Sequence, residues 1–184
     1  VWMSDLTRIL CLGNEDEATE LLQEWRDCVA EPDPDDMGWD EDDEIDPNEI
    51  DEPRLDALAR AGMNRASIGV QDFDPMIQTV IGRHQPFDLT RRAADMIRAR
   101  GVGSLNADIL YGLPFQTNPR IADSVQKLLT LSPDRVALYG YAHVPWMSRR
   151  QQMIPSDAMP TPQERLDLFE TARKLFVWDG YDEI

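Results

Sequence analysis

Apolar and polar positions alternate in blocks along residues 44–184. Three largely apolar runs have the length and composition of strands, at 66–70, 105–110 and 136–140. A short strand is also expected at 44–45, and another begins at residue 181. Between these runs, apolar residues recur every three or four positions, which is typical of helices with one buried face. The alternation of strand and helix predicts parallel strands joined by right-handed crossovers.

Helix-boundary residues delimit the segments between these strands. The signals are proline in a first turn, glycine just past a last turn, and a threonine–glutamate capping box. They predict helices from about Asp51 to Gly62, from Asp88 to Gly101, around Ile121 to Leu129, and from Thr161 with Glu164 to Gly180. Each helix carries an apolar stripe, so we expect helices to cover the sheet.

Two architectures fit this order of elements, a doubly wound sheet and a barrel. No glycine-rich phosphate loop of the dinucleotide or P-loop type opens any of the helices, which favours the barrel. A complete eight-fold barrel needs about 250 residues, and this pattern supplies about half of one. We therefore expect an α/β fold, a partial TIM-like (β/α) barrel in which an incomplete parallel sheet with outer helices is truncated at its C-terminal end.

The first 43 residues have a different pattern. Residues 14–30 predict one amphipathic helix, with Asn14 at its N-cap and acidic residues in its first turn. Residues 31–43 are rich in proline, glycine and acidic side chains, as in a connector. The expected organisation is an atypical N-terminal segment over residues 1–43 and a partial barrel over residues 44–184.

The charge of the chain disfavours several classes of partner. The chain carries 35 acidic and 18 basic residues, for a net charge of -17. Such a surface repels nucleic-acid backbones and anionic membranes. No apolar run approaches the length of a membrane span, and the first residues have neither the basic flank nor the apolar stretch of a signal peptide. We expect a cytoplasmic protein with no nucleic-acid or membrane partner.

Polar side chains lie on or just after the predicted strands, where parallel barrels place their catalytic and ligand-binding residues. Glu44 lies on or beside the first strand, and Gln71 follows the second. Asp108 sits within the third strand, and His143 follows the fourth. These groups could converge on one bound ligand.

Most of these candidates also have an ordinary explanation. Glu44 adjoins an acidic run and could be solvated, and Gln71 could cap the turn that follows it. Arg83 could pair with a surface carboxylate, and His143 could be a structural histidine. Asp108 is harder to explain in this way, because a carboxylate inside an apolar strand is costly to bury without a partner.

Cysteine and histidine content argues against a metal site. Cys11 and Cys28 stand seventeen positions apart, which matches no compact metal motif. The only histidines are His84 and His143, in different predicted loops. We predict no metal site in this chain.

Five stretches of the sequence resemble the oxygen-independent coproporphyrinogen III oxidases of the radical SAM superfamily. They begin at Glu44, Asn64, Asn106, Pro133 and Tyr139 and read EIDP, NRASIGVQDF, NADILYGLPFQT, PDRV and YGYAHVP. The resemblance covers roughly residues 44–184 in unbroken order. The related haem-chaperone branch shares the GVQ and YGLP elements, but QDF and YAHVP look more like the oxidase.

The resemblance implies S-adenosylmethionine (SAM) and a [4Fe–4S] cluster as cofactors. In that family three cysteines of a Cys-x3-Cys-x2-Cys loop hold the cluster, and reductive cleavage of SAM yields a deoxyadenosyl radical. The radical starts the oxidative decarboxylation of coproporphyrinogen III to protoporphyrinogen IX in anaerobic haem synthesis. The resemblance also implies an electron donor, and a monomer when the enzyme is full length.

Specific residues follow from the same motifs. Five positions match the SAM-binding residues of the family: Glu44, Gln71, Arg83, Asp108 and Ala142. Carboxylates and amides can hold ribose hydroxyls and the methionine amine, and arginine can reach a carboxylate. Arg149 and Arg150, close to the YAHVP stretch, are candidates for binding substrate carboxylates. Nearby Trp146, Met147 and Met153 are either core residues or the lining of an apolar pocket.

Two elements of the family are missing from this sequence. They are the Cys-x3-Cys-x2-Cys loop and the Gly-Gly-Gly-Thr-Pro stretch expected before Glu44. Residues 1–43 do not resemble what precedes this region in the family. We therefore expect a fragment carrying roughly the middle of the barrel and inactive in isolation. The alternatives are a non-catalytic haem-binding chaperone of the same superfamily and an acidic interaction module using residues 31–52.

Overall fold

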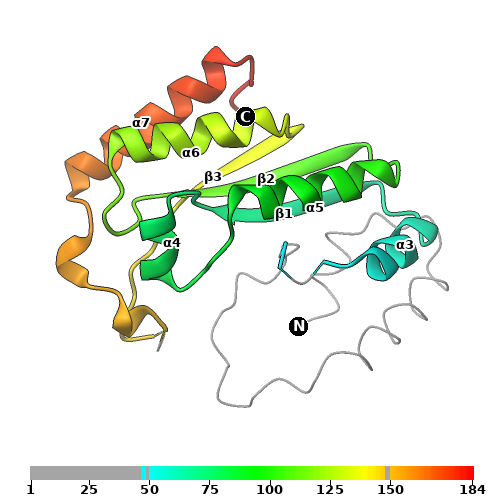
Figure 1. Cartoon of the computed structure of the whole chain (residues 1–184). Coiled ribbons are helices and arrows are strands. Elements are labelled where there is room, and N and C mark those ends of the chain that lie inside the picture. The colour runs from blue at the N-terminus through cyan, green and yellow to red at the C-terminus, as the bar shows by residue number, and fades with distance from the viewer. Residues whose placement is uncertain (1–46, 49, 148–149) are drawn as a thin grey trace.

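The computed structural model describes residues 47–48, 50–147 and 150–184 (Figure 1). The expected helix at 14–30, the acidic connector and the strand at 44–45 lie outside the described residues. The expected boundary at residues 43 and 44 also lies outside them and stays a prediction.

Three parallel strands form one sheet in the described part of the chain. They are β1 (Arg65–Gln71), β2 (Ser104–Tyr111) and β3 (Arg135–Gly140), side by side in chain order. Three of the predicted strands, those at 66–70, 105–110 and 136–140, are confirmed, each longer by one or two residues. Their common direction places all three carboxyl ends at one edge of the sheet.

Four of the helices were predicted from their boundary signals and are confirmed. They are α3 (Glu52–Arg60), α5 (Phe87–Ala99), α6 (Asn118–Thr130) and α7 (Pro162–Trp178). Three short elements were not predicted: α4 (Pro75–Ile81), η1 (Arg150–Met153) and η2 (Ser156–Ala158). All three short elements lie in connections that follow strand ends.

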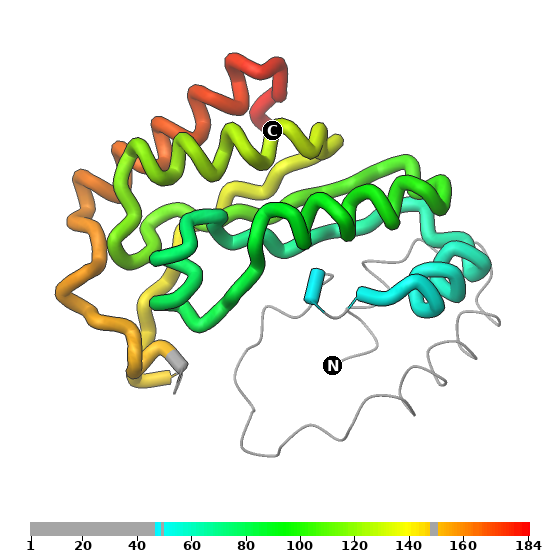
Figure 2. Tube along the Cα trace, in the orientation of Figure 1, coloured from blue at the N-terminus to red at the C-terminus, as the bar shows by residue number. Residues whose placement is uncertain are grey.

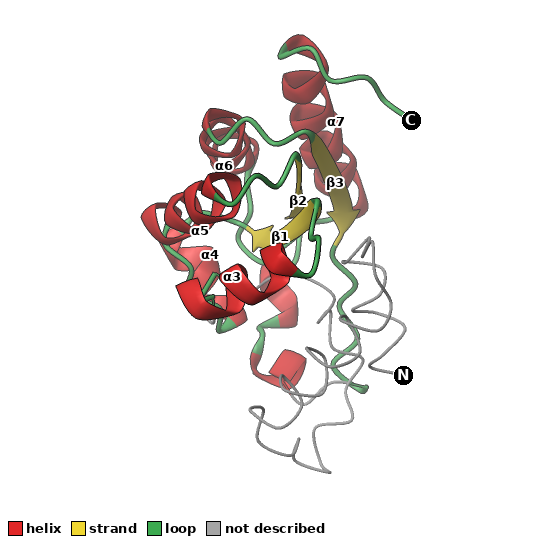
Figure 3. Cartoon of the chain, turned by 90° about the vertical axis from the view of Figure 1, so that its right-hand side faces the viewer, coloured by secondary structure: helices red, strands yellow, loops and turns green. Residues whose placement is uncertain are grey.

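Helices α5, α6 and α7 share one apolar core with the sheet, and Figures 2 and 3 show α5 and α6 on one side of it. The core between the layers contains Leu105, Ala107 and Ile109 of β2 together with apolar residues of all three helices. A doubly wound sheet would carry helices on both faces, whereas a barrel carries them only outside. The described elements therefore follow the barrel arrangement, and the predicted fold class is confirmed.

The opposite face of the sheet is polar at its centre. Asn106 and Asp108 alternate with the core residues of β2, so their side chains project away from the helices. Ser67 of β1 pairs with Asn106 in the parallel register and shares this face. In a barrel this face would be the interior, so the polar residues are placed where a ligand could be held.

A second apolar cluster lies at the carboxyl ends of the strands. It joins Ile77 of α4 and Leu110 of β2 to residues of the loops beyond them, Leu113, Tyr141 and Ile154. Helix α4 forms because Asp74 caps its N-terminus by accepting from Met76 N and Ile77 N, Pro75 opens its first turn, and Gly82 ends it at φ +71°. Gln71, which could have capped the turn, does not form this cap.

The prediction that a strand begins at residue 181 is wrong, because residues 181–184 form no strand. After Gly180 ends α7, the Tyr181 ring packs edge-on against Phe176, with 5.9 Å between ring centroids. The Tyr181 hydroxyl donates to the carbonyl of Pro133. These contacts hold the segment by its side chain, without backbone bonds to β3. No helix in the described ranges is long and apolar enough to cross a bilayer.

The capping box at the start of α7 gives a stability prediction. Thr161 Oγ1 accepts from Glu164 N at 3.3 Å, and the Glu164 carboxylate accepts from Thr161 N at 2.8 Å. Replacing Thr161 with alanine should lower the free energy of unfolding by about 1 kcal/mol, measured by urea denaturation.

Thr171 of the same helix provides the matched control. Its hydroxyl donates to the Asp167 carbonyl, which the helix already bonds, at 2.7 Å. Thr171→Ala should leave the free energy of unfolding unchanged or slightly higher, because alanine is the better helix former. Equal losses in the two variants would contradict the role assigned to the cap.

Candidate functional site

The end of β1 has an irregular backbone. The pairing with β2 skips a residue between Gly69 and Gln71, and Gln71 adopts a left-handed conformation at φ +60°. A non-glycine residue in this region is uncommon and is held only when its surroundings impose it. The bulge places the buried Gln71 at the carboxyl edge of the sheet, where the sequence predicted a site residue.

Asp108 is held in a compact polar cluster on the inner face. Its Oδ1 accepts from Asn106 Nδ2 at 2.6 Å, and its Oδ2 accepts from Ser67 Oγ at 3.4 Å. Asn106 Nδ2 also donates to Ser67 Oγ at 2.8 Å. The residue is only 7% exposed, so these donors stabilise a carboxylate that would otherwise be costly to bury. The sequence identified Asp108 but neither of its partners.

Arg83 lies in the connection that follows α4. Its backbone N–H donates to the Gln78 carbonyl at 2.9 Å, and its Nε donates to Gln85 Oε1 at 3.2 Å. Within the described ranges Arg83 makes no ion pair, so the proposed pairing with a surface carboxylate is not seen there. Its guanidinium keeps donors for an anionic ligand.

A second buried carboxylate, Asp72, ties the loops after β1 and β2 together. It is 0% exposed. Its Oδ1 accepts from Asp74 N and Ser124 Oγ, and its Oδ2 accepts from Gln116 Nε2, all at 2.7 Å. Burial raises the pKa of the Asp72 carboxyl, and the three donors oppose that rise. The contacts fix where the chain goes immediately after Gln71.

Gln116 shapes the loop that follows β2. Its Oε1 accepts from Gly112 N at 2.7 Å and from Leu113 N at 3.3 Å, while its Nε2 also donates to the Leu110 carbonyl at 3.0 Å. Gln116 belongs to the NADILYGLPFQT stretch, but the sequence alone predicted no role for it. An amide buried in a loop of an otherwise apolar motif was the available signal, because such a group needs several partners.

The loop after β3 reaches the same edge of the sheet. Tyr141 N donates to the Tyr111 carbonyl at 2.9 Å. Ala142 is exposed, and its carbonyl accepts from Gln151 Nε2 at 3.2 Å. His143 Nε2 bonds Ser156 Oγ at 2.8 Å, whereas its buried Nδ1 has no partner among the described residues. A purely structural role for His143 therefore explains the hydrogen bond of Nε2 but gives no partner for Nδ1 among the described residues.

The structure thus brings part of the predicted site to one edge. Gln71 and Ala142 lie at the ends of β1 and β3, Asp108 lies on the inner face of β2, and Gln85 links Arg83 to β1. The remaining candidates are not placed by the described residues: Glu44, Arg149 and the side chain of Arg150.

Three apolar residues near that loop are not part of the core. Trp146 is 76% exposed and Met153 is 82% exposed, and Met147 is exposed as well. Of the two explanations offered by the sequence, burial in the core is wrong for the described fold.

Arg165 of α7 was not identified from the sequence. Its guanidinium lies 5.5 Å from the centroid of the Tyr111 ring, within the range of a cation–π contact. It also fills the space beside Gly112 and Gly140, where a Cβ on Gly140 would lie 2.7 Å from Arg165 Nη2 and 2.9 Å from Tyr111 Oη. Arg165 therefore joins α7 to the ends of β2 and β3, and a side chain at position 140 would displace its guanidinium.

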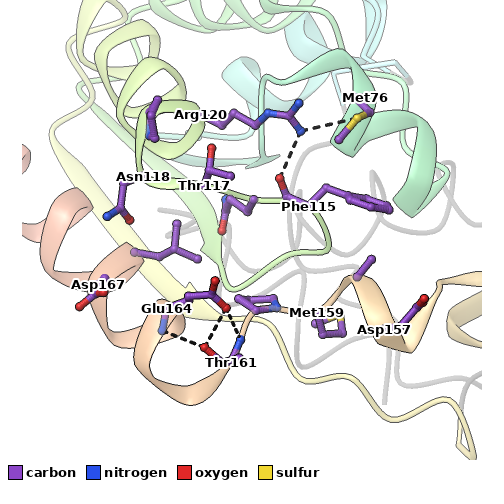
Figure 4. A pocket seen from close by; sticks show the side chains of 15 residues that line it. Met76, Phe115, Thr117, Asn118, Arg120, Asp157, Met159, Thr161, Glu164 and Asp167 are labelled. Carbon is purple, nitrogen blue, oxygen red and sulfur yellow. Dashed lines mark hydrogen bonds between the residues drawn. The ribbon is translucent and has the colours of Figure 1, made fainter.

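A groove of about 1100 Å³ opens elsewhere, between the β2–α6 loop and the start of α7 (Figure 4). Met76 and Phe115 line one side, and Met159 and Glu164 line the other. None of the predicted ligand-binding residues that the structure describes lines it. The groove is therefore separate from the candidate site at the strand ends.

Comparison with known proteins identifies the class to which this arrangement belongs. Residues 8–128 match the model of the radical SAM superfamily. The chain therefore belongs to the radical SAM superfamily. The match begins at residue 8, so the similarity to the superfamily extends into the segment before Glu44. The expectation that residues 1–43 do not resemble the family is corrected by this match.

Relatives narrow the likeness further. The chain is 76% identical over 141 residues to the oxygen-independent coproporphyrinogen III oxidase of Paracoccus denitrificans, a match covering 77% of this chain and 31% of that protein. It is 62% identical over 165 residues to the protein of the same name from Cereibacter sphaeroides, covering 90% and 36%. The chain spans about a third of the length of these relatives.

A solved structure gives the same picture. The coproporphyrinogen III oxidase (HemN) from Escherichia coli, a radical SAM enzyme, superposes with a TM-score of 0.72 at 35% sequence identity. The match covers 76% of this chain and 32% of that one. The resemblance inferred from the five sequence stretches is thus confirmed.

The superfamily implies SAM and a [4Fe–4S] cluster, and the residues present fit the two differently. The polar groups at the strand ends suit SAM, which offers an amine, a carboxylate and ribose hydroxyls. The cluster does not fit this chain, because the sequence contains no Cys-x3-Cys-x2-Cys loop. Within the described residues, no three His, Cys, Asp or Glu side chains are grouped to hold a metal ion.

The contact between Gly140 and Arg165 gives a second prediction. Gly140→Ala should displace the guanidinium from Tyr111 and lower the free energy of unfolding by about 0.5–1 kcal/mol, the size of an exposed cation–π contact. Gly103→Ala is the control, because a Cβ there meets nothing within 4 Å. Urea denaturation of both variants tests this, and a Gly140→Ala protein as stable as Gly103→Ala would refute the role of the contact.

Burial of Asp72 gives a prediction about pH. Its folded-state pKa is raised above the ordinary 3.8, so its stabilising contribution is full below that value and is lost as pH rises through the raised pKa. Asn cannot ionise. The free energy by which wild type exceeds Asp72→Asn should therefore be larger at pH 4 than at pH 7.

Urea denaturation at the two pH values measures this difference. Asp123→Asn is the matched control, since Asp123 is exposed and pairs with Lys127 at 2.7 Å on the surface. Its substitution should change the free energy of unfolding by at most about 1 kcal/mol. A gap between wild type and Asp72→Asn that widens toward pH 7 would show that the sign is wrong.

Proposed function

We propose that this chain provides the SAM-binding part of an oxygen-independent coproporphyrinogen III oxidase. The reaction is the oxidative decarboxylation of coproporphyrinogen III to protoporphyrinogen IX, started by a SAM-derived radical, in anaerobic haem synthesis. The observation that carries the proposal is the 76% identity to a protein of that name over the region whose strand ends carry Gln71, Asp108 and Ala142. An electron donor, a monomeric full-length state and a cytoplasmic location are parts of the same proposal.

Each residue has a role that its surroundings support. The Asp108 carboxylate, oriented by Asn106, would accept from ribose hydroxyls or from the methionine amine. The Gln71 amide lies at the same edge, and Arg83 would bind the methionine carboxylate with its remaining guanidinium donors. Ala142 would contribute through its backbone, and Glu44 would add a second carboxylate.

The chemistry of the reaction comes from the cofactors, and the protein orients and shields it. SAM, when bound beside a reduced cluster, supplies the radical that abstracts hydrogen from a propionate. This chain lacks the cysteine loop, so no step through a cluster is assigned to its residues. Their part is to bind SAM in one orientation and to keep water from it.

The substrate is a tetracarboxylate, which an acidic surface disfavours. Arg149 and Arg150 are proposed to supply local positive charge for its carboxylates. Exposed apolar surface at Trp146 and Met153 supports this placement, because the macrocycle between the carboxylates is apolar. Neither the haem chaperone nor the acidic interaction module is favoured by a feature of the described fold.

A chimera tests the proposal. Residues 44–184 replace the matching segment of the Paracoccus denitrificans oxidase, which brings its own cysteine loop. The chimera should convert coproporphyrinogen III to protoporphyrinogen IX under anaerobic conditions at a rate within about tenfold of the parent, measured by chromatography of the porphyrins. Asp108→Ala in the chimera should lower kcat/KM by about 100-fold or more, the effect of losing a group that holds the reacting cofactor.

Asp123→Ala provides the control for that substitution and should leave the rate unchanged. Asp123 is an exposed carboxylate on α6 that pairs with Lys127. A folded chimera that carries its cluster and cleaves SAM but forms no protoporphyrinogen IX would overturn the proposed substrate. A chimera that fails to bind SAM would overturn the proposed cofactor site.

A further inference from the structure

Gln85 is a fully buried side chain near the candidate site that makes three hydrogen bonds. It is 0% exposed and lies in the loop between α4 and α5. Its Nε2 donates to the Gly69 carbonyl at 2.7 Å and to Thr90 Oγ1 at 3.1 Å. Its Oε1 accepts from Arg83 Nε at 3.2 Å. One buried amide thus contacts β1, α5 and Arg83.

The backbone of Gln85 is fixed as firmly as its side chain. Gln78 Nε2 donates to the Gln85 carbonyl at 2.6 Å, and Gln85 N donates to Gln78 Oε1 at 3.1 Å. Gln78 Nε2 also donates to the Asp72 carbonyl at 2.8 Å. This pair of glutamines joins α4 to the loop after β1, so Gln85 has little freedom to shift.

The orientation of the Gln85 amide follows from the chemistry of its partners. The Gly69 carbonyl can only accept, so the nitrogen must face β1. The oxygen must then face Arg83, whose guanidinium can only donate. The pairing with β2 becomes irregular after Gly69, so the bond from Gln85 lies at the start of the bulge that leads to Gln71.

Arg83 depends on this arrangement for its direction. Its side chain is half-buried, and it has no carboxylate partner among the described residues. The bond to Gln85 uses the Nε donor and leaves the terminal nitrogens for a ligand. A long side chain held at one donor loses less freedom when a ligand binds.

We propose that Gln85 is a positioning residue that orients Arg83 toward the carboxylate of bound SAM and is itself anchored on the Gly69 carbonyl. The inference rests on the proposed function, which assigns Arg83 to SAM. Gln85 does not touch the ligand. Its effect on SAM affinity passes through the guanidinium of Arg83.

A double-mutant cycle tests the proposal. The measured quantity is the dissociation constant of SAM, obtained by equilibrium dialysis. It is measured for the chimera with its cluster reconstituted and for the full 184-residue chain. Gln85→Leu should weaken SAM binding by about tenfold or more, the effect of losing a hydrogen bond to a charged group. In an Arg83→Ala background the same change should alter affinity by less than about twofold, because coupled residues are not additive.

Thr90→Val separates positioning from general damage. It removes the other acceptor of Gln85 Nε2 and leaves the bonds to Gly69 and Arg83 in place. It should lower the midpoint of thermal unfolding while SAM affinity stays within about twofold of wild type. The ¹⁵N–¹H signal of Arg83 Nε supplies a readout without ligand, and its hydrogen exchange should accelerate in Gln85→Leu but not in Thr90→Val.

The outcomes distinguish this inference from the proposed function. If wild type binds SAM and Gln85→Leu binds it equally well, Gln85 is structural and the inference fails alone. Additive effects of Gln85→Leu and Arg83→Ala would lead to the same conclusion. If neither wild-type protein binds SAM, the proposed cofactor site fails, and the inference fails with it.

Discussion

A buried carboxylate can be accommodated only if donors surround it, and Asp72 imposes that requirement on two successive loops of this chain. Its partners come from α4's own cap residue Asp74, from Gln116 in the next loop, and from Ser124 on α6. Removing the Gln116 or the Ser124 side chain would take one donor away from this buried carboxyl group. The strand ends are therefore locked to one another by polar contacts, while the helices are held to the sheet by apolar packing.

Apolar packing therefore stabilises the fold, whereas hydrogen bonds between polar groups stabilise the candidate site. The apolar layer under α5, α6 and α7 determines which face of the sheet is covered and which strands are neighbours. The polar contacts determine how the chain leaves each strand, which is where Gln71 and Asp72 are found. Superfamily membership and a TM-score of 0.72 to a radical SAM enzyme agree with a scaffold of this kind.

The sequence predicted what depends on periodicity and local signals. Apolar runs gave the three strands, and the Thr161–Glu164 box gave the start of α7. Helix α4 was missed although Asp74, Pro75 and Gly82 are its cap, first turn and stop, because seven residues carry too little periodicity to stand out. The strand at residue 181 was wrong, because an apolar residue after a glycine also suits docking by a side chain, as Tyr181 shows.

The sequence predicted which residues belong to the candidate site, but not their backbone conformations or hydrogen-bond partners. Gln71 and Asp108 were identified by position relative to strands, but the left-handed backbone of Gln71 and the partners of Asp108 arise from contacts across β1 and β2. Gln85 and Arg165 carry no local signal, because the contacts that tie them to the sheet, with Gly69 and Tyr111, lie 16 or more residues away in the chain. Motif likeness was able to select Arg83, whereas physical reasoning from the sequence alone did not place it.

The absence of a side chain at position 140 has a meaning beyond stability. The volume that a methyl group would take is used by the Arg165 guanidinium, so these two positions share one space although they lie 25 residues apart. In a lineage that gains a side chain at position 140, a shorter residue at position 165 would restore the space between them. Among divergent members of this superfamily, residue size at 140 and residue length at 165 should vary inversely, leaving a record of how α7 is fastened to the sheet.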